Sequence, residues 1–200
     1  MFDVKLTLEQ RQYAWGLVQK HNFGNRGVFD GNAERQYTGI LGQTVMADGL
    51  GMERPTELGG FDNGIDFTIL GRNVDLKTMG RHSKPKWSSG WVNNLLESQT
   101  HYETDFYVFS SIHKDDRVMT VVGMISKPKV LRMTPLPVGT ERRRHDGTTF
   151  NLTVPEYEIP NPDLDPLNGW HEITWSIDRS RLSTGQPIAR EGQPDILSSW

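Results

Sequence analysis

The sequence predicts a mixed α/β domain, in which helices flank a central mixed sheet and a short-stranded appendage follows at the C-terminal end. Helical periodicity occupies much of the first 50 residues. Strands rich in β-branched and aromatic residues follow in residues 65–79 and 105–125, and residues 129–170 are rich in proline and turn residues. A chain of 200 residues that is 35% hydrophobic and 24% charged can form one globular domain. We therefore expect a core in residues 1–130 and, within the same domain, a proline-rich β appendage with a loose tail in residues 131–200.

Two helices are predicted before residue 51. Residues 7–21 form the first, because Thr7 can cap it and Gln10 stands where a capping box requires it. Three glycines within residues 22–32 end this pattern, and Asn32 opens the second helix. The apolar residues of the second helix recur at steps of three and four: Tyr37, Ile40, Leu41, Val45 and Met46. The helix ends at Gly49 and Gly51.

A β-hairpin is predicted next, because residues 65–70 and 73–79 both have strand character. Gly71 and Arg72 separate these two strands. Glycine at the first position of a two-residue loop is typical of a type II′ turn. This turn fixes the register of the two strands.

The register of this hairpin brings three charged side chains together. It places Asp66 opposite Lys77 and Thr68 opposite Asp75. Because side chains alternate between the faces of a strand, Asp66, Asp75 and Lys77 then share one face. A loop longer by one residue would turn Asp66 to the other face.

The rest of the chain begins with a polar, basic loop in residues 80–90. In order, the elements predicted after it are a helix in residues 91–103, strands in residues 105–112, 118–125 and 171–177, and a loose tail in residues 183–200.

Composition excludes several classes of protein. The chain has no cysteine, which excludes a disulfide framework and a cysteine-ligated zinc or iron–sulfur site. The first residues lack a charged start followed by an apolar segment, and no run of about 18 apolar residues occurs. We expect a soluble, cytoplasmic protein without a membrane partner.

Charge is distributed unevenly along the chain, whose net charge is −3. Residues 72–86 contain five basic residues and one acid, and residues 126–144 contain six basic residues and one acid. From residue 145 onward, nine acids stand against three arginines. A basic middle and an acidic end favour an oriented polyanionic partner, and a solvated charged face is the alternative.

The three charges of the hairpin indicate a metal site. Carboxylates on neighbouring strands repel each other and lose solvation, unless a hard cation such as Mg²⁺ or Mn²⁺ takes them as ligands. Lys77 can then stabilise charge on a phosphate or orient the attacking water. Asp66, Asp75 and Lys77 with a metal would form a phosphodiester-hydrolysing site. The alternative is a surface hairpin with an Asp–Lys cross-strand pair, and Asp3 and Lys5 repeat the same spacing elsewhere.

The segments "ID" at residues 65–66 and "VDLK" at residues 74–77 resemble the signature of the PD-(D/E)xK nuclease superfamily. The resemblance covers about residues 32–112. The proline that the family places before its first aspartate is Ile65 here. The resemblance implies a restriction-endonuclease-like core with the order helix, three strands, helix, strand.

The resemblance also implies the roles of individual residues. Asp66 and Asp75 would bind Mg²⁺ or Mn²⁺, with the backbone carbonyl of Leu76 as a further ligand. Lys77 would be the catalytic lysine.

Many members of the family carry an additional acid on the preceding helix. Residues 32–41 resemble the opening helix of resolvase-type members, which indicates Glu34. Gln43 stands where other members place their acid, so it remains an alternative. The two residues are two and a half turns apart and cannot both reach one metal. Glu34 is preferred because it adds negative charge.

Basic residues after the second strand are candidates for contacts with phosphates: Arg81, His82, Lys84 and Lys86. A solvated loop is the alternative. The predicted function is a metal-dependent nuclease that hydrolyses DNA phosphodiester bonds with water as the nucleophile, and a homodimer is a candidate assembly. Two alternatives stay open, namely a nucleic-acid-binding or assembly protein with a vestigial nuclease site, and an RNA-directed nuclease.

Overall fold

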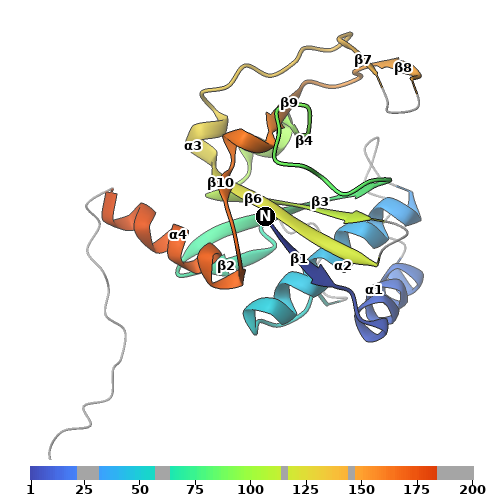
Figure 1. Ribbon diagram of the computed structural model, residues 1–200, viewed down its shortest axis with the longest axis vertical. Helices are drawn as coiled ribbons and strands as arrows, with labels where there is room; N and C mark the ends of the chain where they lie inside the picture. The colour runs from blue at the N-terminus through green and yellow to red at the C-terminus, as the bar shows by residue number, and fades with distance from the viewer. Residues whose placement is uncertain (22–31, 57–63, 114–116, 144–146, 184–200) are drawn as a thin grey trace, which may run out of the picture.

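The computed structural model describes residues 1–21, 32–56, 64–113, 117–143 and 147–183 (Figure 1). Its main sheet has the strand order β1-β6-β5-β3-β2, and β10 also pairs with β6. The strands are β1 (Phe2–Lys5), β2 (Phe67–Ile69), β3 (Arg72–Arg81), β5 (Phe106–His113), β6 (Val118–Ser126) and β10 (Asp165–Pro166). β3 and β5 run parallel, whereas the other pairs are antiparallel. The predicted mixed α/β class with a mixed sheet is confirmed.

Helices cover one face of the main sheet, and a small second sheet covers the other. In Figure 1, α1 and α2 lie below the main sheet, and β4, β9 and α3 lie above it. The remaining elements are α1 (Leu8–His21), α2 (Ala33–Leu50), β4 (Val92–Leu96), η1 (Glu97–His101), α3 (Lys127–Val130), β7 (Glu141–Arg143), β8 (Thr149–Asn151), β9 (Glu156–Pro160), η2 (Asn161–Asp163) and α4 (Trp170–Ser183). Here η denotes a 3-10 helix. β4 pairs with β9, and β7 pairs with β8.

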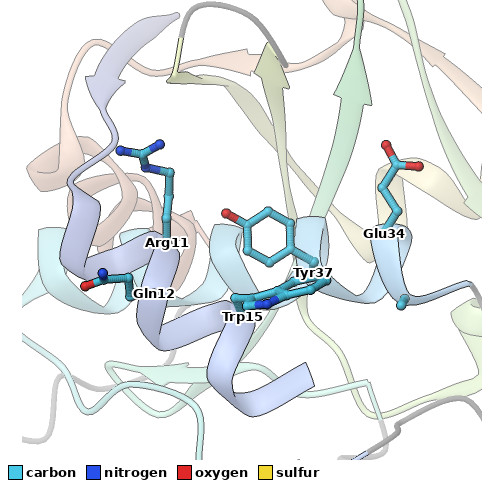
Figure 2. Close-up of a pocket in the computed structure, with 6 residues that line it drawn as sticks. Arg11, Gln12, Trp15, Glu34 and Tyr37 are labelled. Atoms are coloured by element: carbon cyan, nitrogen blue, oxygen red, sulfur yellow. The ribbon is translucent and has the colours of Figure 1, made fainter. Parts of the chain in front are cut away.

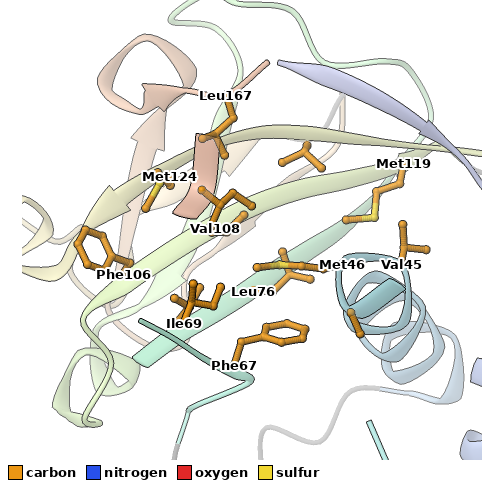
Figure 3. Packing of buried hydrophobic residues seen from close by; sticks show 14 of the residues in the cluster. Val45, Met46, Phe67, Ile69, Leu76, Phe106, Val108, Met119, Met124 and Leu167 are labelled. Carbon is orange, nitrogen blue, oxygen red and sulfur yellow. The ribbon is translucent and has the colours of Figure 1, made fainter. Parts of the chain in front are cut away.

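The larger hydrophobic core lies between the main sheet and the helices (Figure 3). Val74 and Leu76 of β3 belong to it, together with Val108 of β5. Met46 of α2 and Ile177 of α4 pack into the same cluster. The even-numbered residues of this part of β3 therefore face the helices.

The odd-numbered residues of β3 face the second sheet. In the parallel register, Asp75 lies beside Tyr107 and Lys77 lies beside Phe109. Tyr107 and Phe109 are fully buried in the smaller core, with residues of β4 and β9. Asp75 and Lys77 consequently project from the face opposite the one that α2 covers.

The two N-terminal helices form as their ends predict. A capping box starts α1. The backbone N–H of Gln10 donates to the Thr7 hydroxyl at 3.1 Å, and the backbone N–H of Thr7 donates to the Gln10 side-chain carbonyl at 3.0 Å. At the start of α2, the Arg35 amide donates to the Asn32 side chain at 3.0 Å. α2 ends at Gly51, whose φ of 67° is the left-handed conformation that glycine permits.

The hairpin between β2 and β3 turns at Leu70 and Gly71, one residue earlier than predicted. Both have positive φ, 50° and 67°, which is the pattern of a type I′ turn and not of a type II′ turn. The register is shifted by two residues, with Phe67 opposite Val74, and the backbone N–H of Asp66, just before β2, also donates to the Val74 carbonyl, so Asp66 does not lie opposite Lys77. An even shift keeps the side chains of the paired residues on their faces, so Asp75 and Lys77 still share one face, whereas a shared face with Asp66, which lies outside the paired residues, stays a prediction.

The helix predicted in residues 91–103 is wrong. These residues form β4 and the short 3-10 helix η1. The buried Asn93 of β4 donates from its side chain to the Ile159 carbonyl at 3.1 Å and to the Asn161 side chain at 2.8 Å. These partners lie more than 60 positions away. No pattern within the segment indicates them.

The strand predicted in residues 171–177 is also wrong, because these residues lie in α4. Ile173, Trp175 and Ile177 imitate the alternation of a strand. However, Ile173 and Ile177 are fully buried, whereas Trp175 is 55% exposed. Residues four apart share one face of a helix, and this face packs into the core with α2.

Two further differences concern the ends of the chain. The strand β1 was not predicted, and it pairs along the edge of β6. Within the predicted appendage, β10 also pairs with β6, and β9 pairs with β4. Two predicted segments lie outside the described residues. They are the tail after residue 183 and residues 22–31, which were predicted to separate the first two helices. In the part of the chain that is described, no helix is both long enough and apolar enough to cross a membrane.

Candidate functional site at the β2 and β3 strands

Asp66 lies immediately before β2, at the edge of β3. Its backbone N–H donates to the Val74 carbonyl at 3.1 Å. Its carboxylate accepts two hydrogen bonds, from Gln43 Nε2 to Oδ1 at 2.5 Å and from the Leu76 backbone N–H to Oδ2 at 2.7 Å. The Leu76 N–H has no backbone acceptor in β2, so the Asp66 carboxylate accepts its hydrogen bond instead. A backbone N–H in a strand needs such a partner. Asp66 is held from two directions.

Asp75 and Lys77 form an ion pair on one face of β3. Lys77 Nζ lies 2.7 Å from Asp75 Oδ2. The Asp75 side chain is 2% exposed and the Lys77 side chain 21%. A buried carboxylate is costly unless a cation compensates it, which Lys77 does here. Burial, and secondly the negative charge of Asp75, raise the pKa of Tyr107 above its ordinary value.

The two aspartates meet at one peptide group. Asp66 Oδ2 accepts from the amide that joins Asp75 to Leu76. In an antiparallel ladder the N–H and C=O of one residue point to the same side, so the Leu76 carbonyl also faces this edge. Among the described strands, none pairs with this edge of β3 beyond Val74. We call Asp66, Asp75, Leu76 and Lys77 the β2–β3 fork, and the structure brings these four residues together.

The oxygen atoms of the β2–β3 fork match a hard divalent cation in kind. Mg²⁺ prefers carboxylate and carbonyl oxygens and keeps several of its own waters. Asp66, Asp75 and the Leu76 carbonyl offer such ligands. Within the described residues, no group of three or more His, Cys, Asp or Glu side chains could hold a metal ion. A bound cation at the β2–β3 fork therefore stays a prediction, and its binding would replace some present contacts of the carboxylates.

Gln43 of α2 contacts the β2–β3 fork through its hydrogen bond to Asp66. Glu34 is exposed in the first turn of α2, about 13 Å away along the helix axis. It lines an open hollow of about 600 Å³ between α1 and α2, together with Trp15 and Tyr37 (Figure 2). Of the two candidates on this helix, Gln43 is the one that the structure joins to Asp66, and a catalytic role for Glu34 stays a prediction.

The basic residues predicted to contact substrate lie at the end of β3 and in the loop after it: Arg81, His82, Lys84 and Lys86. Arg81 is half-buried and donates from Nε to the Ser111 hydroxyl at 3.0 Å and from Nη2 to the Val92 carbonyl at 2.5 Å. Lys84 forms an ion pair with Asp3 of β1. The other two side chains are exposed. Arg81 therefore has a structural role in addition to any contact with a ligand.

Arg143 of β7 was not predicted as a site residue, although it lines a hollow with Arg81 and His82. A signal was present, because Arg143 belongs to the second basic cluster, in residues 126–144. Nothing local indicates that this cluster folds against the first, since 39 residues separate the two clusters.

Comparison of the chain with descriptions of known protein families, with curated protein sequences and with solved structures found no match. The fold and the site together define a mixed α/β protein with a carboxylate-rich strand edge. Its function has to be inferred from its own residues.

Proposed function

We propose that the chain is a divalent-metal-dependent nuclease that hydrolyses DNA phosphodiester bonds at the β2–β3 fork. One observation carries the proposal. Asp66 contacts the Leu76 amide directly beside the ion pair of Asp75 and Lys77. This arrangement gathers two carboxylates, a carbonyl and an ammonium at one strand edge. A hairpin with only a structural role gains little from burying an aspartate, because burial of a carboxylate costs free energy.

Each residue of the β2–β3 fork has a role in this proposal. Asp66, Asp75 and the Leu76 carbonyl would hold Mg²⁺ or Mn²⁺. Such a cation, when bound, supplies activation of water and neutralises charge on the phosphodiester. Gln43 fixes one oxygen of Asp66, which orients this carboxylate before substrate binds. Lys77 donates hydrogen bonds to the phosphate oxygen that gains charge during the reaction.

The order of the elements supports a restriction-endonuclease-like core. From α2 to β5 the chain runs helix, three strands, 3-10 helix, strand, which is the order that the resemblance implies. Two features depart from it. β4, the third strand, pairs with β9 outside the main sheet, and the short η1 stands where a longer helix is expected.

The test is cleavage of plasmid DNA by the purified protein in Mg²⁺, in Mn²⁺ and in chelator. We expect nicked or linear product only with a cation. Asp75→Asn keeps the shape of the side chain and removes its charge, so it should lower the rate about 100-fold or more. Asp163→Asn is the matched control, because Asp163 is exposed on η2, and it should retain full activity.

Two results would contradict this assignment. One is the absence of cleavage by the parent protein in both metals. The other is unchanged cleavage by an Asp75→Asn protein whose circular dichroism spectrum matches the parent. Single-stranded and duplex RNA, tested in parallel, distinguish a DNA-directed from an RNA-directed enzyme.

A nucleic-acid-binding protein with a vestigial site is the second candidate. The observation that favours it is that both carboxylates already have protein partners. Asp66 accepts from two N–H groups, and Asp75 is paired with Lys77. In such a fork the carboxylates have partners without a cation. This candidate predicts binding of DNA without cleavage in either metal, so the same assay separates the two functions.

A further inference from the structure

A polar hollow of about 530 Å³ lies at the end of β3, beyond the β2–β3 fork. Its lining comes from the end of β3 and the loop after it, from the residue before β4 and from β7, and includes Gly80, Arg81, His82, Ser83, Trp91 and Arg143. Three of these residues are basic. None of the described residues that line it is acidic. The hollow therefore suits an anion.

Arg81 forms a fixed wall of this hollow. Its guanidinium donates to Ser111 and to the Val92 carbonyl, and it stacks over the Trp91 ring with 5.4 Å between the guanidinium carbon and the ring centre. Burial lowers the pKa of Arg81. Within the described part of the chain, no carboxylate forms an ion pair with Arg81. A half-buried cation without a counter-ion is costly, and an anion in the hollow would compensate it. A guanidinium has five N–H donors, so Arg81 can hold the strands and also bind a ligand.

The loop that forms the second wall is also held in place. Asn161 is fully buried at the end of β9. Its side-chain Nδ2 donates to the Lys86 carbonyl at 2.7 Å, and its backbone N–H donates to the Trp91 carbonyl at 2.9 Å. These bonds fix the loop at two points. A hollow with fixed walls loses little conformational freedom when a ligand binds.

The position of the hollow separates it from the proposed cleavage centre. Lys77 and Arg81 lie on the same face of β3, four residues or about 13 Å apart. A second hollow, of about 640 Å³, shares Gly80 with the first and lies between Thr78 and Met79 of β3 and the start of α2, where Glu34 and Arg35 line it. If one DNA strand runs along β3, Arg81 and Lys77 therefore contact two different phosphates of that DNA strand.

We infer that the hollow at the end of β3 binds a backbone phosphate of single-stranded DNA, an inference that rests on the proposed function in taking the ligand to be a nucleic acid. Arg81 and Arg143, which both line the hollow, donate to the phosphate. Trp87, in the same loop, is 40% exposed and offers a ring on which an unpaired base stacks. A single strand offers both a phosphate and an unpaired base, whereas a duplex keeps its bases stacked on each other.

The first test measures binding of a fluorescent single-stranded oligonucleotide by anisotropy, from 50 to 200 mM salt, with all variants made in the Asp75→Asn protein. Arg143→Ala should weaken binding and lower the slope of log affinity against log salt by about 0.7, the value for one phosphate contact to a single strand. As salt rises from 50 to 200 mM, the dissociation constant of Arg143→Ala divided by that of the parent should then fall about threefold. Arg132→Ala removes another exposed arginine, after α3, and should leave the slope unchanged.

The second test concerns the form of the nucleic acid. Trp87→Ala should weaken binding of the single strand about tenfold, and should change binding of a duplex of the same sequence much less. Equal effects of Arg143→Ala and Arg132→Ala would overturn the phosphate site. Equal effects of Trp87→Ala on single strand and duplex would overturn the assignment to single strands. Because binding is measured without turnover, a failed cleavage assay contradicts the proposed function and leaves these outcomes readable.

Discussion

The two aspartates of the β2–β3 fork have different partners, and this difference decides which one a cation would depend on more. Asp66 is held by two neutral N–H donors, from Gln43 and Leu76. Asp75 is held by the ammonium of Lys77. Neutral donors orient a carboxylate without cancelling its charge, whereas an ammonium compensates it. In the proposed function Asp66 is therefore a ligand that Gln43 positions.

We expect Gln43→Ala to impair cleavage more than Glu34→Gln. Loss of a hydrogen bond to a charged group typically costs about 1.5–3 kcal/mol, which corresponds to about a tenfold or larger fall in rate if it is lost from the reacting complex. Without Gln43, Asp66 is less well oriented for a cation, so the Mg²⁺ concentration for half-maximal activity should rise. A merely structural role for Gln43 would lower thermal stability and leave this concentration unchanged.

The control for this comparison is Gln12→Ala, which removes an exposed glutamine from α1. It should change neither the rate nor the Mg²⁺ requirement. If Glu34→Gln instead raises the Mg²⁺ requirement and Gln43→Ala does not, then Glu34 supplies the additional acid and the role given to Gln43 is wrong.

At the scale of elements, the position of α2 matters because it carries Gln43. A polar cluster ties α2 to α1 and to the segment after α2. Asp48 of α2 accepts from Gln10 Nε2 of α1 at 2.8 Å, and its two oxygens accept from Arg54 at 2.6 and 2.9 Å. Arg54 also donates to Glu9 of α1 at 2.9 Å. The hydrogen bonds from Arg54, with a smaller contribution from Gln10, hold the pKa of Asp48 below its ordinary value despite partial burial.

This cluster should make the packing of α1 on α2 sensitive to acid. A carboxyl group whose pKa is lower in the folded than in the unfolded protein stabilises the fold above its unfolded pKa of about 3.9. The stabilisation is lost as the pH falls through the lowered folded pKa. We expect Asp48→Asn to reduce the free energy of unfolding at pH 7 by about 1 kcal/mol or less, because the cluster is partly exposed. The difference between parent and variant should narrow from pH 5 to pH 3.

Urea unfolding at several pH values measures this difference, with Asp163→Asn as the control that should match the parent throughout. A difference between parent and Asp48→Asn that stays constant from pH 7 to pH 3 would mean that Asp48 acts through packing and not through its charge.

Local signals predicted some elements well and others badly. The capping residues Thr7, Gln10 and Asn32 act within four residues of their partners, so the sequence contains their whole environment. β4 and α4 depend on distant partners. Asn93 is stable in a strand because Ile159 and Asn161 accept its hydrogen bonds, which no local pattern indicates.

The same distinction applies to the candidate site. Asp66, Asp75 and Lys77 belong to one hairpin, and the shared face of Asp75 and Lys77 followed from alternation even though the turn type and the register were wrong. The contact of Gln43 with Asp66 joins two elements that are 23 positions apart, and it could be proposed only as an alternative. The hollow between Arg81 and Arg143 depends on the tertiary fold. The distribution of charge along the sequence identified both basic clusters. It did not indicate that Arg81 of one cluster and Arg143 of the other line the same hollow.

At the scale of the whole molecule, the two proposals assign turnover to the β2–β3 fork and binding to the hollow at the end of β3. If Lys77 acts as proposed, Lys77→Ala should lower the turnover number about 100-fold or more, because it removes the charge that would stabilise the reacting phosphate. Its effect on DNA affinity should be small, because one lysine is a minor part of a phosphate-contacting surface. Arg143→Ala should do the reverse. Since Lys77→Ala also leaves Asp75 buried without its partner, Lys77→Arg serves as a second variant that keeps the positive charge.

The double variant Lys77→Ala/Arg143→Ala tests whether the two sites are independent. Sites about 13 Å apart that share no partner usually have additive effects, within about 0.5 kcal/mol. At saturating DNA, the turnover number of the double variant should therefore equal that of Lys77→Ala. At limiting DNA, its affinity for DNA should equal that of Arg143→Ala. If Arg143→Ala alone lowers turnover at saturating DNA, the phosphate at Arg143 positions the reacting bond. The two sites would then form one catalytic surface along β3, because a contact that acts only on affinity is silent once the DNA is fully bound.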